Sequence, residues 1–183
     1  DNRLLAHFNR RRLNAEEIRD GLLVTSAQLD PTPAESHPFP PEATWTFSQH
    51  NPFNAVYETN KRSAYLMVQR QRSHPFLALF DGADPNASTP ERQTTTVPTQ
   101  ALYFLNDSFF HTQAAAFTTS LMKLPDDDSR TTQAYRVLFQ RLPTSAEQDR
   151  VKAFIASYPG SPDEKWAAYA RVLLASNEFI HLD

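Results

Sequence analysis

The stretch DDDSRTTQAYRVLFQRLPTSAEQ, residues 126–148, contains the clearest structural signals in the chain and predicts two consecutive helices. Three aspartates followed by Ser129 place capping oxygens and negative charge at the start of a helix, where the macrodipole is positive. An apolar face then recurs at helical spacing, formed by Ala134, Tyr135, Leu138 and Phe139. Thr144 with Glu147 is a capping box, which starts the next helix. This part of the chain is therefore expected to be helical.

Outside this stretch, similar signals predict short helices along most of the chain. Asn14 with Glu17 forms another capping box, so a helix is expected to start near Ala15. Gly21 lies inside that helix, where Gly costs about 1 kcal/mol of helix stability relative to Ala. We therefore expect Gly21 to permit a close helix crossing. The helical spacing of Leu4, Leu5 and Phe8 predicts a first helix at the N-terminus. Further helices are expected over 75–80, 98–105, 107–124 and 163–174. The fold class is therefore predicted to be mainly α, a bundle of short helices.

Residues 31–60 have a different character, because six prolines remove backbone donors and fix φ. The segment is also rich in aromatic side chains, namely Phe39, Trp45, Phe47, Phe53 and Tyr57. Burial of each is worth about 2 kcal/mol, so we expect an irregular segment that wraps around the helical core. An aromatic platform that stacks sugars is the alternative. A period of two in 45–48 and in part of 64–69 predicts two short strands that pair with each other.

Length and composition exclude several classes of protein. With 183 residues, the chain is the size of one domain, and we expect a single helical domain over 1–183. No stretch approaches the roughly 20 apolar residues of a membrane span. The formal charge of −3 lacks the cationic excess of a typical nucleic-acid binder. The absence of cysteine excludes disulfides, thiolate zinc sites and covalent c-type haem.

Motifs that carry enzyme chemistry are absent from the sequence. The three glycines are isolated, so there is no glycine-rich loop for a phosphate or dinucleotide, and no serine lies in a nucleophile elbow. The histidines are scattered, and we expect none of them to be catalytic; they are His7, His37, His50, His74, His111 and His181. Asp84, Asn86 and Ser88 alternate as in part of a calcium loop, but Asx turns explain the same residues and no metal site is predicted.

Two groups of positive charge suggest a site for an anion or an acidic polymer. They are Arg10–Arg12 and the set Lys61, Arg62, Arg70 and Arg72. The alternative is that these side chains cover apolar surface and pair with Glu16, Glu17, Asp81 and Asp84. The candidate ligand-binding residues are Arg62, Arg70, Arg72, Asp81, Asp84, Asn86, Arg92 and Gln100. A binding or catalytic site requires that they converge on one pocket with unpaired charges.

Particular motifs distributed over nearly the whole chain carry a family resemblance. They are Asn9–Leu13, Glu17–Asp20, Arg62–Leu66, Leu79–Asp81, Asp84–Asn86, Arg92, Thr95, Pro98–Leu102, Leu105–Asp107, Ala134–Arg136, Arg141–Thr144, Glu147 and Ser176–Phe179. With these motifs the chain resembles the planctomycete domain of unknown function, family number 1553. Some relatives carry Cys where Ser88 stands, a departure that further weakens a metal or redox role for that loop.

The resemblance implies a setting rather than an activity. Members are large exported bacterial proteins in which this domain follows a companion domain and often accompanies a c-type cytochrome domain. The chain is accordingly expected to be an excised C-terminal part of such a protein, located in the periplasm or cell envelope, with no cofactor of its own. We expect a non-catalytic scaffold or interaction domain whose partners are neighbouring domains. The alternatives are a domain that binds or cleaves an acidic envelope polysaccharide, and a docking surface for the cytochrome domain.

Overall fold

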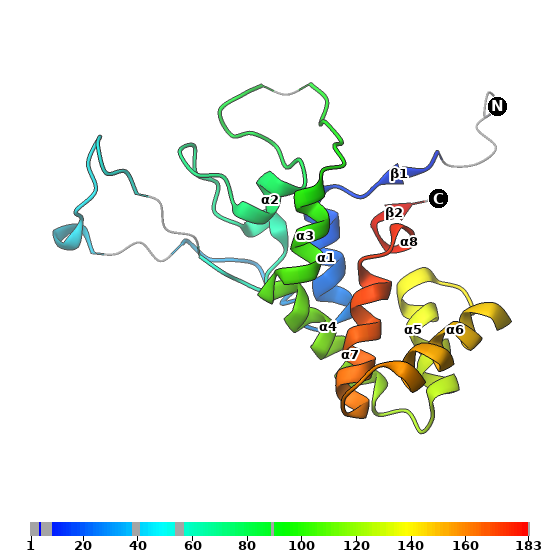
Figure 1. Cartoon of the computed structure of the whole chain (residues 1–183). Coiled ribbons are helices and arrows are strands. Elements are labelled where there is room, and N and C mark those ends of the chain that lie inside the picture. The colour runs from blue at the N-terminus through cyan, green and yellow to red at the C-terminus, as the bar shows by residue number, and fades with distance from the viewer. Residues whose placement is uncertain (1–3, 5–8, 38–40, 54–56, 89, 183) are drawn as a thin grey trace.

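The computed structural model describes residues 4, 9–37, 41–53, 57–88 and 90–182, and most of its regular structure is helical. The helices are α1 (Ala15–Thr25), α2 (Pro75–Leu79), α3 (Pro98–Asn106), α4 (Ser108–Leu121), α5 (Asp127–Phe139), α6 (Ser145–Ser157), α7 (Pro162–Leu174) and α8 (Asn177–Ile180). The strands are β1 (Arg11–Arg12) and β2 (His181–Leu182), and short 3₁₀ turns lie at Glu42–Thr44 and Ser63–Tyr65. Figure 1 shows the helices gathered into one bundle. The predicted mainly α class is confirmed.

The helix starts are set by the predicted caps. The Glu17 carboxylate accepts the Asn14 backbone N–H at 2.7 Å, and Asp126 accepts the Ser129 N–H at the same distance. Thr144 and Glu147 bond reciprocally, which completes the second predicted capping box. A third box, Ser161 with Glu164, starts α7 one residue earlier than predicted. The predicted N-terminal helix lies outside the described residues, except for Leu4.

The core lies where α4 and α7 pack along each other, with α1, α2 and α5 around them. Ile18 and Leu22 of α1, Phe110 and Phe117 of α4 and Trp166 of α7 are all at most 1% exposed. Aromatic rings extend this core from α2 to α3, as Phe76 and Phe80 contact Tyr103 with ring centroids 5.3 and 5.5 Å apart. The bundle therefore holds α2 and α3 rigidly against α4.

The two predicted strands at 45–48 and 64–69 are wrong. The first region follows a 3₁₀ turn and closes as a tight loop, in which the Ser48 and Asn51 backbones bond to each other. The second begins with the 3₁₀ turn Ser63–Tyr65. The small β element is instead made by the ends of the chain, because β1 pairs antiparallel with β2 and places Arg11 opposite Leu182. Short alternation beside prolines is a poor strand signal, because the missing donors leave few ladder bonds to make.

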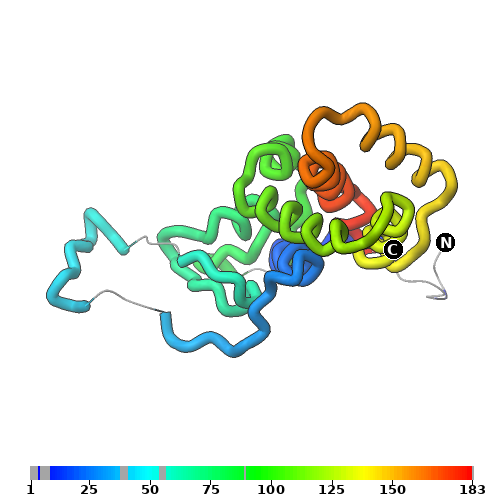
Figure 2. The backbone as a smooth tube through the Cα atoms, turned by 90° about the horizontal axis from the view of Figure 1, so that it is seen from below, coloured from blue at the N-terminus to red at the C-terminus, as the bar shows by residue number. Residues whose placement is uncertain are grey.

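Residues 41–53 also behave differently from the expectation of a wrapping segment. Figures 1 and 2 show them extending away from the helical core. Trp45 is 46% exposed. Its ring lies 5.1 Å from that of Phe47, which in turn lies 5.3 Å from Phe53. The aromatic side chains therefore pack on one another, while Phe39 lies outside the described residues.

Gly21 does not mark an obligatory close crossing. A Cβ built on it would lie 3.6 Å from the nearest heavy atom, Cζ of Phe179, which is an ordinary contact. Gly82 is the constrained glycine, since a Cβ there would lie 2.7 Å from the carbonyl oxygen of Leu77. The sequence alone did not distinguish these two positions.

Candidate functional site

Asp81 is the centre of a polar cluster that joins the chain end of α2, the start of α3 and strand β1. It leaves α2 with a positive φ of 61°, which turns the chain into the following loop. Its carboxylate accepts the backbone N–H and the hydroxyl of Thr95, each at 2.8 Å, and forms an ion pair with Arg12 at 2.5 Å. The side chains of Arg12 and Asp81 are only 7% and 15% exposed. The hydrogen bonds between Asp81 and Thr95 therefore join the two ends of this loop, and the nearly buried ion pair with Arg12 fixes it to β1.

The remaining hydrogen-bonding capacity of this cluster is largely used within the protein. Arg12 also donates to the carbonyl oxygens of Thr95 and Phe80 and to Oε1 of Gln100. Gln100 is buried, and its Nε2 donates to the carbonyl oxygen of Leu79 at 3.0 Å. Burial alone would raise the pKa of Asp81, but the hydrogen bonds from Thr95 and Arg12 outweigh it and lower that pKa. With Asp81 ionised, the cluster is thus arranged to fix the surrounding backbone.

The other predicted ligand-binding residues have separate local surroundings. Arg92 pairs with Glu16 of α1 at 2.5 Å. Asp84 accepts the Asn86 backbone N–H at 2.9 Å, and the Asn86 amide donates to the carbonyl oxygen of Arg70 at 2.6 Å, so these two residues shape a turn. Arg62, Arg70, Arg72 and Ser88 are exposed.

A surface hollow of about 520 Å³ brings together part of the predicted set, namely Asp81, Asp84, Ser88 and Arg92. It does not include Arg62, Arg70, Arg72, Asn86 or Gln100. Among the described residues, no group of three His, Cys, Asp or Glu side chains is placed to hold a metal ion. A ligand role for the predicted residues stays a prediction.

Arg11 and Arg12 follow the pairing alternative, and Lys61 pairs with an acid that was not predicted. Arg11 binds Glu17 through both guanidinium nitrogens at 2.8 Å, and Lys61 pairs with Asp30 at 2.8 Å. These pairs connect strand β1 to α1 and the end of α1 to residue 61, where Asp30 and Lys61 also form a β-bridge. Each of these ion pairs therefore joins two segments of the chain.

A second polar cluster, which the sequence did not predict, surrounds a cavity of about 170 Å³ between α1, α2 and α3. Its lining includes Arg19, Glu58, His74, Tyr103 and Asp107. Arg19 is only 2% exposed, and its guanidinium donates to the carbonyl oxygens of Lys61 and Thr59 and lies 5.4 Å above the ring of Phe109. This arginine is satisfied by backbone oxygens, and it holds residues 59–63 against α1.

His74 is the unusual member of this cluster. Both its ring nitrogens are buried and have no hydrogen-bond partner in the described chain. Burial lowers the pKa of His74, and Arg19 contributes in the same direction, against an opposite effect of Glu58. Burial likewise raises the pKa of Tyr103, which lies beside Asp107. At neutral pH the imidazole is therefore neutral, enclosed and able to accept or donate one hydrogen bond at each nitrogen.

One signal for this cluster was present in the sequence. Arg19 falls on the same helical face as Ala15, Ile18, Leu22 and Leu23, all of which are fully buried. A charged side chain on an apolar face indicates a buried polar contact. No comparable signal identified His74, because its neighbours in the cavity come from residues far away in sequence.

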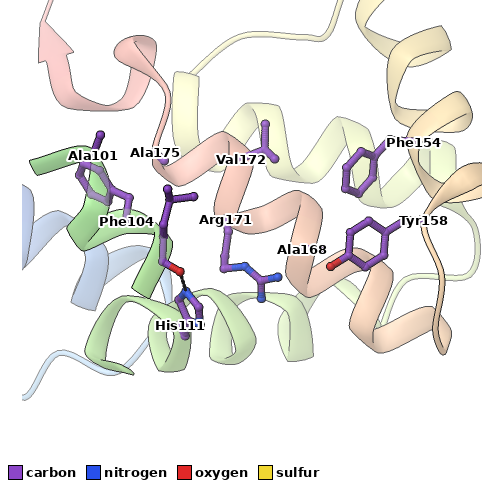
Figure 3. Close-up of a pocket in the computed structure, with 10 residues that line it drawn as sticks. Ala101, Phe104, His111, Phe154, Tyr158, Ala168, Arg171, Val172 and Ala175 are labelled. Atoms are coloured by element: carbon purple, nitrogen blue, oxygen red, sulfur yellow. Dashed lines mark hydrogen bonds between the residues drawn. The ribbon is translucent and has the colours of Figure 1, made fainter. Parts of the chain in front are cut away.

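An apolar groove of about 610 Å³ is shown in Figure 3. Its walls come from α3, α4, α7 and the C-terminal part of α6. The lining residues are Ala101, Phe104, Leu105, His111, Phe154, Tyr158, Ala168, Arg171, Val172 and Ala175. Apart from His111, Tyr158 and Arg171, these lining residues are apolar.

Comparison with known proteins gave one family match. A family model described as PSD1, protein of unknown function (DUF1553), matches residues 1–155. No curated protein and no solved structure matches the chain.

Proposed function

Since this chain belongs to the PSD1 family of proteins of unknown function (DUF1553), we propose that it is a non-catalytic interaction domain of an exported multidomain protein. Its role is to position neighbouring domains of the same polypeptide. Among the described residues, no helix is long and apolar enough to cross a membrane. The proposed partners are the other folded domains of that polypeptide.

The observation that carries this proposal is the use made of the central polar residues. Arg12 donates to Asp81, to Gln100 and to the carbonyl oxygen of Phe80. Asp81 also accepts from Thr95, and Gln100 donates to the carbonyl oxygen of Leu79. A catalytic group needs a free face toward its substrate. Here the carboxylate receives an ion pair and two hydrogen bonds from the protein, which leaves it little capacity for chemistry. The apolar groove, in contrast, offers an open surface.

The test is an equilibrium binding experiment between the 183-residue chain and each of the other domains of the parent protein, by isothermal titration calorimetry. We expect at least one domain to bind, with a negative heat-capacity change that reflects burial of apolar surface. If no domain binds at concentrations up to about 1 mM, where even a weak complex of about −4 kcal/mol is half formed, the proposal is wrong.

An enzyme or binder that acts on an acidic envelope polysaccharide is the competing proposal, and the hollow beside Asp84 and Arg92 is the observation in its favour. It is disfavoured because Arg92 is already paired with Glu16. A soluble polyuronate is the appropriate probe. Its saturable binding, abolished in Arg92→Gln but not in Arg62→Gln, would favour this alternative.

A further inference from the structure

The apolar groove carries a positive charge that no carboxylate of the described residues neutralises. Arg171, on α7, lines the groove and is half-buried, and no hydrogen bond or ion pair involves its side chain in the described chain. In Figure 3 its guanidinium lies between Phe104 and His111 on one side and Tyr158 on the other. Other partly buried arginines of the protein are paired with carboxylates, among them Arg12, Arg130 and Arg141.

The sides of the groove are apolar and open to solvent. Leu105 and Val172 are 67% and 54% exposed, and Leu102 beside them is 53% exposed. On the opposite wall Phe154 and Tyr158 stack with ring centroids 5.2 Å apart. Contiguous apolar surface around a concave region is typical of protein interaction sites, whereas scattered single side chains are not.

The groove walls determine what shape can fill it. They are built from helices, and the described part of the chain offers only the two-residue ladder of β1 and β2 as a sheet edge. An added β-strand therefore has no edge to pair with here, and its backbone groups would be left unsatisfied. An α-helix satisfies its own backbone and presents a row of apolar side chains at i, i+3, i+4 and i+7.

We propose that this groove binds an amphipathic helix of a neighbouring domain, and that a carboxylate within the apolar face of that helix pairs with Arg171. This inference rests on the proposed function and names the surface and the partner. A guanidinium binds a carboxylate through two parallel hydrogen bonds. Partial exclusion of water by Phe104 and Tyr158 strengthens such a pair relative to one on an open surface. Leu105 and Val172 supply the apolar contacts on either side of it.

The experiment has two arms. In the first, the neighbouring domain that binds the chain is titrated against wild type, Arg171→Glu and the matched control Arg136→Glu. Arg136 is exposed on α5 and does not line the groove. In the second, a fluorescent helical peptide of about five turns, with leucines at i, i+3, i+4 and i+7 and one central Glu, is titrated against the same proteins. A peptide with Lys in place of that Glu is its control.

We expect Arg171→Glu to weaken binding of the domain and of the Glu peptide at least tenfold, and Arg136→Glu to change neither by more than about twofold. The Lys peptide should bind wild type at least tenfold more weakly than the Glu peptide. Leu105→Lys is a second variant of the groove. Because the Leu105 side chain is exposed, this variant should unfold at the same temperature as wild type.

The outcomes separate this inference from the proposed function. If a domain binds but Arg171→Glu and Leu105→Lys leave its affinity unchanged, the groove is the wrong surface and only the proposed function stands. If no domain binds while the Glu peptide binds through Arg171, the groove specificity stands and the proposed function is wrong. If neither binds, the inference is overturned. It is also overturned if sedimentation equilibrium shows a dimer that Leu105→Lys dissociates, because a second copy of the chain then covers the groove.

Discussion

Replacing Arg12 by methionine tests whether the polar cluster around Asp81 stabilises the fold. The Arg12 side chain is 7% exposed and donates to Asp81, Gln100 and the carbonyl oxygens of Phe80 and Thr95. Methionine keeps much of the apolar stem but removes every donor. Breaking a nearly buried pair by removal of one partner costs about 3–5 kcal/mol, because the other charge remains buried.

The expected loss can be measured by urea unfolding at pH 7, followed by far-ultraviolet circular dichroism. A domain of this size is stable by about 5–15 kcal/mol, so Arg12→Met should remain folded in the absence of urea. Its Tm should fall by about 6–20 °C, since 1 kcal/mol corresponds to about 2–4 °C at this chain length. Arg62→Met is the matched control, because Arg62 is exposed, and it should change stability by no more than about 0.5 kcal/mol.

A double-mutant cycle makes the test specific to the pair. Asp81→Asn alone and together with Arg12→Met should reveal a coupling free energy of about 0.5–3 kcal/mol. The reasoning fails if Arg12→Met and Arg62→Met have the same urea midpoint and the same m-value. In that case the cluster does not stabilise the fold, and its polar groups would be free to serve a ligand.

Three further changes have defined outcomes. Gly21→Ala should stabilise the protein by about 0.5–1 kcal/mol because there is room for a Cβ, whereas Gly82→Ala should destabilise it by steric overlap, and urea midpoints that shift in the same direction would contradict this. Burial lowers the pKa of His74 below 6.5, so its stabilising contribution is complete above that pH and is lost as the pH falls through the folded-state pKa, with a slope of at most about 1.4 kcal/mol per pH unit; His74→Phe should flatten the stability profile between pH 7 and 5, and an unchanged profile refutes this. Hydrogen bonds from Arg141 lower the pKa of Glu147 from 4.5 to about 2, against the effect of burial and together with hydrogen bonds from Thr144, so the contribution of Glu147 is present above pH 4.5 and is lost as the pH falls toward 2; in Arg141→Gln, carboxyl NMR should show a clearly raised pKa of Glu147, and a value still near 2 would exclude Arg141 as the main cause.

The helices and their starts were predictable from the sequence because capping is a local interaction. Thr144 and Glu147 are three residues apart, and Asp126 reaches the N–H of Ser129 within the same turn. Such contacts form whenever the segment is helical, whatever surrounds it. The same locality explains why the turn at Asp84 and Asn86 was foreseen as an Asx turn.

The predicted strands failed because sheet pairing is not local. Arg11 pairs with Leu182 across nearly the whole chain, and nothing in either segment identifies the other. The predicted burial of the aromatic residues in the proline-rich segment failed for a related reason. Trp45, Phe47 and Phe53 can shield one another, and their composition does not distinguish a cluster of their own from a place in the main core.

For the candidate sites, residue types determined what chemistry was available, and tertiary structure decided which groups meet. The sequence excluded thiolate and glycine-loop chemistry, and it indicated that Arg12 and Asp81 carry charge that must be compensated. Only the fold placed them 2.5 Å apart, enclosed His74 beside Arg19, and left Arg171 without a partner among the described residues, in an apolar groove. Ion pairs and cavities depend on distances between segments far apart in the chain, and those distances are set by how the helices pack together.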